Sequence, residues 1–272
     1  MPRALQTDRW LFLSTLALCM IGAVMVFSAS AVTARETYGS AYTFILRQIL
    51  WLACGLLGMF LLMNVDYRRL RQPTVIFTGL AVVLVLLVGV FFLDKSHATH
   101  RWIRIGPASL QPSELAKLAV IIYLAWFLEM RRRVSGKNRI AAAQAHVNDL
   151  QRTLLPALGP VLLFVGLVVL EPDLGTAAQI FLIALGVLFV AGLHGRYLFY
   201  AALVALPLFY LLIVRVPYRN DRLLAFLNPG ADPQGSGFQL LQSLIAVGSG
   251  GFTGVGLMES KQKLFYLPEA HT

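Results

Sequence analysis

Long apolar runs alternate with short polar segments along most of this chain. A helix that crosses a bilayer needs roughly 20 mostly apolar residues, and several runs reach about that length. We predict seven spans, at 10–32, 44–63, 73–93, 111–128, 154–170, 175–193 and 198–214. The pattern therefore predicts an all-α fold, a polytopic membrane helix bundle that forms a single integral-membrane domain over residues 1–272.

The composition supports a membrane protein. Hydrophobic residues make up 58% of the chain and charged residues only 13%, which is unlike a soluble domain. Arg3 and Arg9 precede the first run as in a secretory signal, but the run is longer than a typical signal core and six more follow it. Cys19 and Cys54 lie inside predicted spans, so neither a disulfide framework nor a Cys/His metal site is indicated.

The net charge of +10 has an explanation in its distribution. Lysine and arginine gather in alternate connections, notably 68–71 and 131–139, and are sparse in the connections between them. This asymmetry follows the positive-inside rule and predicts a cytoplasmic N-terminus. The segment 215–272 is then extracytoplasmic, and its polar, glycine-rich sequence is typical of a catalytic loop. No nucleic-acid partner is needed to explain the basicity.

Ionisable residues within or beside the spans are costly in a membrane and therefore point to function. They are Arg47, Glu114, Lys117, Glu171 and Asp173, and none falls in the inner half of a predicted span. Glu114 and Lys117 stand three residues apart, so they share a helix face and are expected to form an ion pair. Such a pair can line a polar cavity, and a purely structural pair would have the same spacing.

Three other positions have both a functional and a structural interpretation. Asp173 follows Glu171 and Pro172 in a tight turn that opens a helix, where it can cap the helix or serve a site. Arg47 can bind a phosphate or extend to lipid headgroups. Arg101 and Trp102 belong to a polar connection, expected to be irregular, that leads into the helix of Glu114.

The segment from 228 onward begins with a turn-rich stretch, NPGADPQGSG, and continues with many glycines. A helix and loop or a re-entrant segment is expected there. Its polar residues are Glu259, Lys261, Gln262, Lys263, Glu269 and His271. The basic groups suit a pyrophosphate, and the acidic groups suit proton transfer or a divalent cation. The alternative is an ordinary solvated loop.

Four blocks of sequence carry a resemblance to a known family. They are RWIRIGPASLQPSELAK (101–117), EPDLGT (171–176), NPGADPQGSGFQLLQSLIAVGSGG (228–251) and YLPEAHT (266–272). In this order and spacing they resemble the SEDS proteins, the shape, elongation, division and sporulation family. GLMESKQK and YLPEAHT look more like the division members, FtsW, than the elongation members, RodA.

The resemblance implies a fold of about ten transmembrane helices and a peptidoglycan glycosyltransferase that polymerises lipid II. It places the protein at the outer face of the bacterial cytoplasmic membrane, at the division site. The implied partners are a class B penicillin-binding protein, which is a transpeptidase, and other divisome proteins. The family motif continues after Thr272 with an aspartate, the expected general base. We therefore expect a C-terminally truncated chain that is itself inactive, and activity in the full-length protein.

From these patterns we assign roles to the candidate residues. Glu114 and Lys117 are the expected catalytic pair, with Asp173 in support. The remaining candidates are expected to bind substrate. Arg101, Lys261 and Lys263 are expected to contact the lipid-linked pyrophosphate, and Glu259, Glu269 and His271 to lie around the reacting sugar. Arg47, Trp102 and Gln262 are further substrate-binding candidates. No metal ligand set is assigned.

Two other functions are compatible with the sequence. A lipid II flippase would need polar groups along the inner half of the spans. A non-catalytic scaffold, or a truncated remnant, would only partner the transpeptidase.

Overall fold

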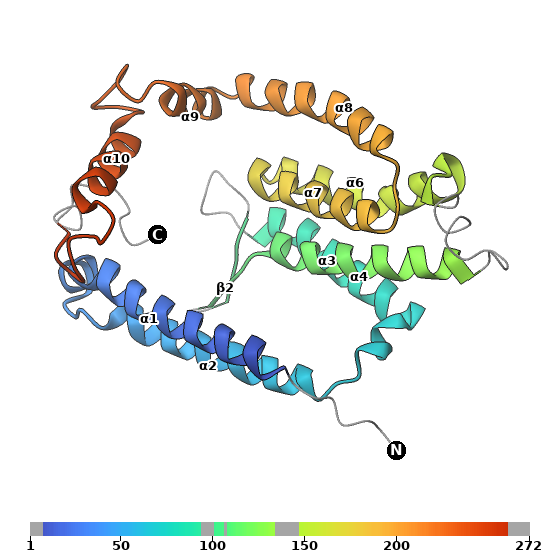
Figure 1. Ribbon diagram of the computed structural model, residues 1–272, viewed down its shortest axis with the longest axis horizontal. Helices are drawn as coiled ribbons and strands as arrows, with labels where there is room; N and C mark the ends of the chain where they lie inside the picture. Colours follow the sequence, from blue (N-terminus) through green and yellow to red (C-terminus); the bar gives the residue numbers. More distant parts are fainter. Residues whose placement is uncertain (1–7, 94–100, 106–107, 134–146, 261–272) are drawn as a thin grey trace. The chain divides into compact units, whose positions relative to one another are not determined.

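The computed structural model describes residues 8–93, 101–105, 108–133 and 147–260 of the chain, and these are mostly helical (Figure 1). The seven long helices are α1 (Arg9–Tyr38), α2 (Thr43–Met63), α3 (Pro73–Leu93), α4 (Pro112–Arg133), α6 (Leu155–Leu170), α7 (Leu174–Val190) and α8 (Gly195–Val214). The shorter elements are η1 (Tyr67–Arg71), β1 (Ile103–Ile105), β2 (Ala108–Leu110), η2 (Leu150–Leu154), α9 (Pro217–Leu227) and α10 (Phe238–Gly250). Each predicted span coincides with one long helix, which confirms the helical membrane fold.

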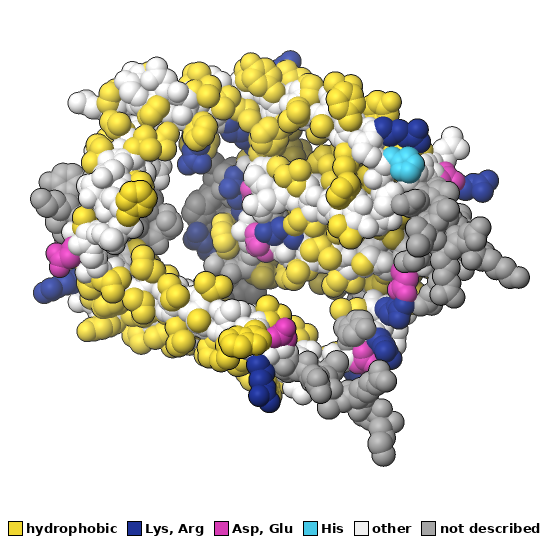
Figure 2. All heavy atoms as spheres, in the orientation of Figure 1, with side chains coloured by type: hydrophobic (Ala, Val, Ile, Leu, Met, Phe, Trp, Pro, Cys, Tyr) yellow, Lys and Arg dark blue, Asp and Glu magenta, His cyan; other side chains and the backbone are white. Residues whose placement is uncertain are grey.

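Helices satisfy their own backbone hydrogen bonds, which a lipid environment requires. Five of the described helical segments are long and apolar enough to cross a membrane: α1, α2, α3, residues 150–170 and α8. The shorter α7 has 17 residues, and α4 carries Glu114, Lys117 and Glu129. Many large apolar side chains remain exposed on these helices, and Figure 2 shows hydrophobic side chains over much of their visible surface. Such surfaces suit contact with lipid.

The described chain divides into two compact units, and residues 67–206 form the second unit in chain order. Here α4 is central, because it packs against α3, α6 and α7. Its buried residues Ala116, Val120, Tyr123 and Leu124 follow one helix face. Small residues allow close approach of helices in membranes, and alanines serve this purpose in α4, α6 and α7.

The connection before α4 contains an element that the sequence analysis did not predict. β1 and β2 pair as an antiparallel hairpin, with Ile103 opposite Leu110 and Ile105 opposite Ala108. We expected irregular turns there, because three-residue strands give little alternation to detect. The helix α4 itself begins at Pro112. Proline suits this position because its missing N–H has no partner in a first helical turn anyway.

Asn148 binds the turn that follows the C-terminal end of α7. Its side-chain Nδ2 donates to the Gly192 carbonyl oxygen at 3.1 Å, and its Oδ1 accepts from the His194 N–H at 2.7 Å. The Tyr197 hydroxyl donates to the Asn148 carbonyl oxygen at 3.1 Å. The segment before η2 is thereby fastened to the turn between α7 and α8.

The other unit combines residues 1–66 with residues 207–272. Within it α1 and α2 pack together, joined by a turn in which Gly39 takes the left-handed conformation (φ 74°). The N–H of Met258 donates to the buried Ser28 hydroxyl on α1 at 3.2 Å. The segment after α10 is thus attached to α1. Expectations for the side of the membrane on which 215–272 lies, and for a single domain over 1–272, stay predictions.

Candidate polar site at the start of helices four and seven

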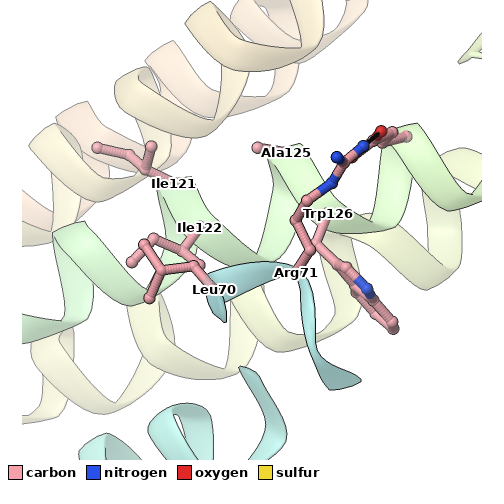
Figure 3. A pocket seen from close by; sticks show the side chains of 7 residues that line it. Leu70, Arg71, Ile121, Ile122, Ala125 and Trp126 are labelled. Atoms are coloured by element: carbon pink, nitrogen blue, oxygen red, sulfur yellow. Dashed lines mark hydrogen bonds and ion pairs between the residues drawn. The ribbon is translucent and has the colours of Figure 1, made fainter. Parts of the chain in front are cut away.

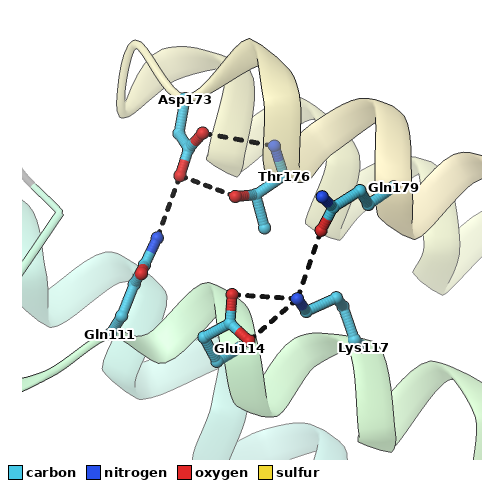
Figure 4. A network of polar contacts seen from close by, with 6 residues as sticks. All are labelled: Gln111, Glu114, Lys117, Asp173, Thr176 and Gln179. Carbon is cyan, nitrogen blue, oxygen red and sulfur yellow. Dashed lines mark hydrogen bonds and ion pairs between the residues drawn. The ribbon is translucent and has the colours of Figure 1, made fainter. Parts of the chain in front are cut away.

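The candidate site is built on the first turns of α4 and α7, two helices that pack against each other (Figure 4). Asp173 is the N-cap of α7. Its Oδ1 accepts from the Thr176 N–H at 3.2 Å, and its Oδ2 accepts from the Thr176 hydroxyl at 2.8 Å. Gln111, just before α4, donates from Nε2 to the same Oδ2 at 2.9 Å. Asp173 therefore caps its own helix and links it to the start of α4.

One helical turn further along, the predicted ion pair between Glu114 and Lys117 is present. The Lys117 ammonium lies 2.9 Å from Glu114 Oε1 and 2.8 Å from Oε2. It also donates to Gln179 Oε1 on α7 at 3.2 Å. The Lys117 side chain is 21% exposed and that of Glu114 is 55% exposed. The lysine is held between the helices, and the carboxylate has an open side for another group.

Arg101 connects the stretch before β1 to the turn between α6 and α7. Its Nη2 donates to the Pro172 carbonyl oxygen, and its Nε lies 3.4 Å from the Glu171 carbonyl oxygen. Trp102, the next residue, is 41% exposed. The sequence-predicted residues Arg101, Glu114, Lys117 and Asp173 thus lie on neighbouring elements of one unit.

Glu171, in the same turn, is fully buried. Neither of its carboxyl oxygens has a hydrogen-bond partner among the described residues. Loss of hydration and, to a smaller extent, the nearby Asp173 raise the pKa of Glu171, Arg101 opposes them, and the net result is a pKa of about 8. The sequence analysis noted this residue as ionisable but did not assign it to the site.

Sequence reasoning missed the amide side chains of Gln111 and Gln179. Gln179 had a detectable signal, because it is the one polar side chain between Ala177 and Val190 in the apolar run of α7. Gln111 gave little signal in the sequence, because its contact with Asp173 depends on how α4 and α7 pack.

Two other sequence-predicted residues belong to the unit that contains α1 and α2. The Arg47 guanidinium lies over the Tyr38 ring, 5.6 Å from its centroid. Glu259 is exposed and follows Gly256, whose φ is 107°. The other candidates, Lys261, Gln262, Lys263, Glu269 and His271, lie outside the described residues. Across the described part of the chain, no group of three or more His, Cys, Asp or Glu is placed to hold a metal ion.

A different feature lies towards the other end of α4. A groove of about 400 Å³ is lined by Leu70, Arg71, Ile121, Ile122, Ala125, Trp126 and Glu129 (Figure 3). Arg71 and Glu129 form an ion pair, with Arg71 Nε donating to Glu129 Oε2 at 3.0 Å. At a rise of 1.5 Å per residue, Glu129 is about 22 Å along the helix from Glu114. The groove is therefore separate from the polar site.

Fold and site together define a polytopic helical membrane protein with polar groups clustered at one end of a bundle. Residues 9–272 match the family model of the cell cycle proteins FtsW, RodA and SpoVE. The chain therefore belongs to this family, which confirms the resemblance to the SEDS proteins.

Named relatives agree with this assignment. The chain is 39% identical over 268 residues to stage V sporulation protein E of Bacillus subtilis, covering 97% of this chain and 69% of the relative. It is 37% identical over 273 residues to a probable peptidoglycan glycosyltransferase FtsW of Trichlorobacter lovleyi, covering 99% and 68%. A chain of a solved peptidoglycan synthase complex, described for its coordination of polymerization and crosslinking, is 34% identical with a TM-score of 0.63, covering 91% of this chain and 67% of that one.

Proposed function

We propose that this protein is a peptidoglycan glycosyltransferase that polymerises lipid II into glycan strands during cell division. The observation that carries the proposal is the similarity of nearly the whole chain to relatives named as probable peptidoglycan glycosyltransferases FtsW. The polar site on α4 and α7 supports it, because it offers cationic and carboxylate groups in a protein that is otherwise strongly apolar.

The reaction joins two lipid-linked sugars. A hydroxyl oxygen of the acceptor disaccharide bonds to the anomeric carbon of the growing strand. The bond from that carbon to the pyrophosphate oxygen breaks, and undecaprenyl pyrophosphate leaves with the electron pair. The hydroxyl proton passes to a carboxylate, and for this role we propose the aspartate expected after Thr272. Cationic groups stabilise the negative charge that develops on the leaving pyrophosphate.

In this scheme Lys117 and Arg101 supply positive charge, and Glu114 holds the Lys117 ammonium in place. The bonds from Lys117 to Glu114 and Gln179 support this role, because they fix the ammonium before substrate arrives. Asp173 supports the site by joining the two helices. Arg47, Trp102, Glu259 and the residues from 261 onward are proposed to contact the remainder of the substrate.

The proposed setting follows the same reasoning. A class B penicillin-binding protein would crosslink the strands, as part of the divisome in the bacterial inner membrane. The similarity to a chain of a synthase complex that couples polymerization to crosslinking supports such a partner.

The test is polymerisation of lipid II by the full-length protein, purified with its transpeptidase and reconstituted in vesicles. Glu114→Ala and Lys117→Ala are each expected to lower the rate by about 10²-fold, a typical loss for one stabilising group in an active site. Glu129→Ala is the matched control, because it removes an ion pair from the other end of the same helix. Near-normal glycan strands from well-inserted Glu114 and Lys117 variants would contradict the proposal.

A further inference from the structure

The turn between α6 and α7 contains two carboxyl groups in contrasting surroundings. Asp173 accepts hydrogen bonds from Gln111 and from the N–H and hydroxyl of Thr176. Glu171, two residues earlier, is fully buried, and both of its carboxyl oxygens lack a donor among the described residues. A buried carboxylate without donors is strongly disfavoured, so such a group takes up a proton instead.

The charged groups that act on Glu171 come from two elements. Asp173, at the start of α7, disfavours a second negative charge beside it, and Arg101, before β1, favours one. On α4, Glu114 and Lys117 are paired with each other. Arg101 donates to the backbone oxygens of Glu171 and Pro172, and the Glu171 carboxyl oxygens accept no hydrogen bond from it. The arginine thus holds the backbone of the turn.

We propose that Glu171 is a positioning residue that acts as a neutral acid, leaving Arg101 on the backbone oxygens of the turn. An ionised Glu171 would attract the guanidinium away from these oxygens and would repel Asp173. Both changes would loosen the stretch around Arg101 and Trp102, and the second would weaken the link between Gln111 and Asp173. The inference rests on the proposed function, because the Arg101 stretch and the Asp173 link both border the site assigned to polymerisation.

The decisive variant is Glu171→Gln, which keeps the shape of the protonated acid and cannot ionise. In the reconstituted full-length complex we expect Glu171→Gln to polymerise lipid II at about the wild-type rate at pH 7. With a pKa of about 8 for Glu171, about a tenth of the wild-type protein keeps the neutral acid at pH 9. The ratio of variant to wild-type rate is therefore expected to rise about tenfold between pH 7 and pH 9. Other titrating groups are the same in both proteins, so their effect on the rate cancels in this ratio.

Glu129→Gln is the matched control, because it makes the same chemical change on α4 away from the turn, and its ratio to wild type should stay constant with pH. An inactive Glu171→Gln at pH 7 would overturn the proposal, because it would mean that the ionised carboxylate is required. A flat ratio for Glu171→Gln would overturn it as well.

A second measurement does not depend on activity. Hydrogen exchange of residues 101–105 and 171–176 is compared between wild type and Glu171→Gln at the same pH. The two proteins should match at pH 6.5, and wild type should exchange faster at pH 9. Equal exchange at both pH values would overturn the inference. Absent polymerisation in every protein, together with this difference in exchange, would instead reject the proposed function and leave the role of Glu171 intact.

Discussion

At the scale of single residues, the site depends on side chains that serve two purposes at once. Asp173 caps α7 and also receives the Gln111 amide from the start of α4. Lys117 neutralises Glu114 and also binds Gln179 on α7. Local stability and the geometry between helices therefore reside in the same few atoms.

Asp173→Ala is expected to damage both functions. Loss of an N-cap costs about 1 kcal/mol, and the Gln111 amide loses its partner as well. Asp149→Ala is the matched control, because Asp149 caps η2 through the Arg152 N–H, within its own segment of the chain. We expect a lower thermal unfolding midpoint for both variants in detergent, and a loss of polymerisation of at least tenfold for Asp173→Ala alone. Equal activity of the two variants would argue against the link between α4 and α7.

Glu171 also makes the stability of the fold depend on pH. Its pKa of about 8 in the folded protein lies above the usual value of 4.5, so the folded state holds a proton that the unfolded chain releases. The stability is fully present below pH 4.5 and falls as pH rises, until the folded group has ionised above pH 8. Glu171→Gln should therefore unfold at the wild-type temperature near pH 4 and at a higher temperature near pH 8. A constant difference in midpoint across this range, measured by thermal unfolding in detergent, would show that Glu171 does not titrate as described.

At the scale of elements, the loop before α10 is a tight structure organised by one aspartate. The Asp232 carboxylate accepts from the N–H groups of Gly235 and Ser236, at 3.0 and 2.8 Å. Gly237 comes next, with its backbone pressed against the carbonyl oxygens of Pro229 and Asp232. The φ of Gly237 is −82°, which any residue can adopt. Glycine is needed there because a side chain would have no room beside these carbonyl oxygens.

Gly237→Ala is expected to disrupt this loop, because the added Cβ would lie 2.8 Å from the Asp232 carbonyl oxygen and closer still to that of Pro229. Gly230→Ala in the same loop meets only the Asn228 side chain at 3.7 Å and serves as the control. We expect Gly237→Ala to expose residues 228–238 to limited proteolysis and to lower polymerisation several-fold, with Gly230→Ala close to wild type. Equal cleavage of both variants would show that the close packing around Gly237 is not required.

Elements differ in how far the sequence could predict them. The spans follow from apolar length, and the capping position of Asp173 follows from the tight turn that opens its helix. The β1–β2 hairpin was not predicted, because strands of three residues each show too little alternation to detect. The ion pair of Glu114 and Lys117 could be predicted because both residues share one helix. Gln179 could not be joined to them, because its contact depends on which helix packs beside α4.

At the scale of the whole molecule, α4 separates two kinds of surface. Its first turns carry the polar network, and the groove with Arg71 and Glu129 lies towards its other end. The same helix supplies the buried centre of the second unit through Val120 and Leu124. The packing of these buried residues holds the polar first turns of α4 beside those of α7. The geometry of the polar site therefore depends on apolar residues outside it.

The unit that contains α1 and α2 also includes residues from position 207 onward. A ribosome adds about 5–20 residues per second, so roughly 7–28 s pass between synthesis of residue 66 and synthesis of residue 207. During this time α1 and α2 lack the residues from 207 onward that belong to their own unit, while the second unit is synthesised. A ribosome stalled after Leu206 would leave a nascent chain in which Ser28 has no Met258 to bind. The order of synthesis thus lets α1 and α2 pack together early and delays the contact of α1 with the segment after α10.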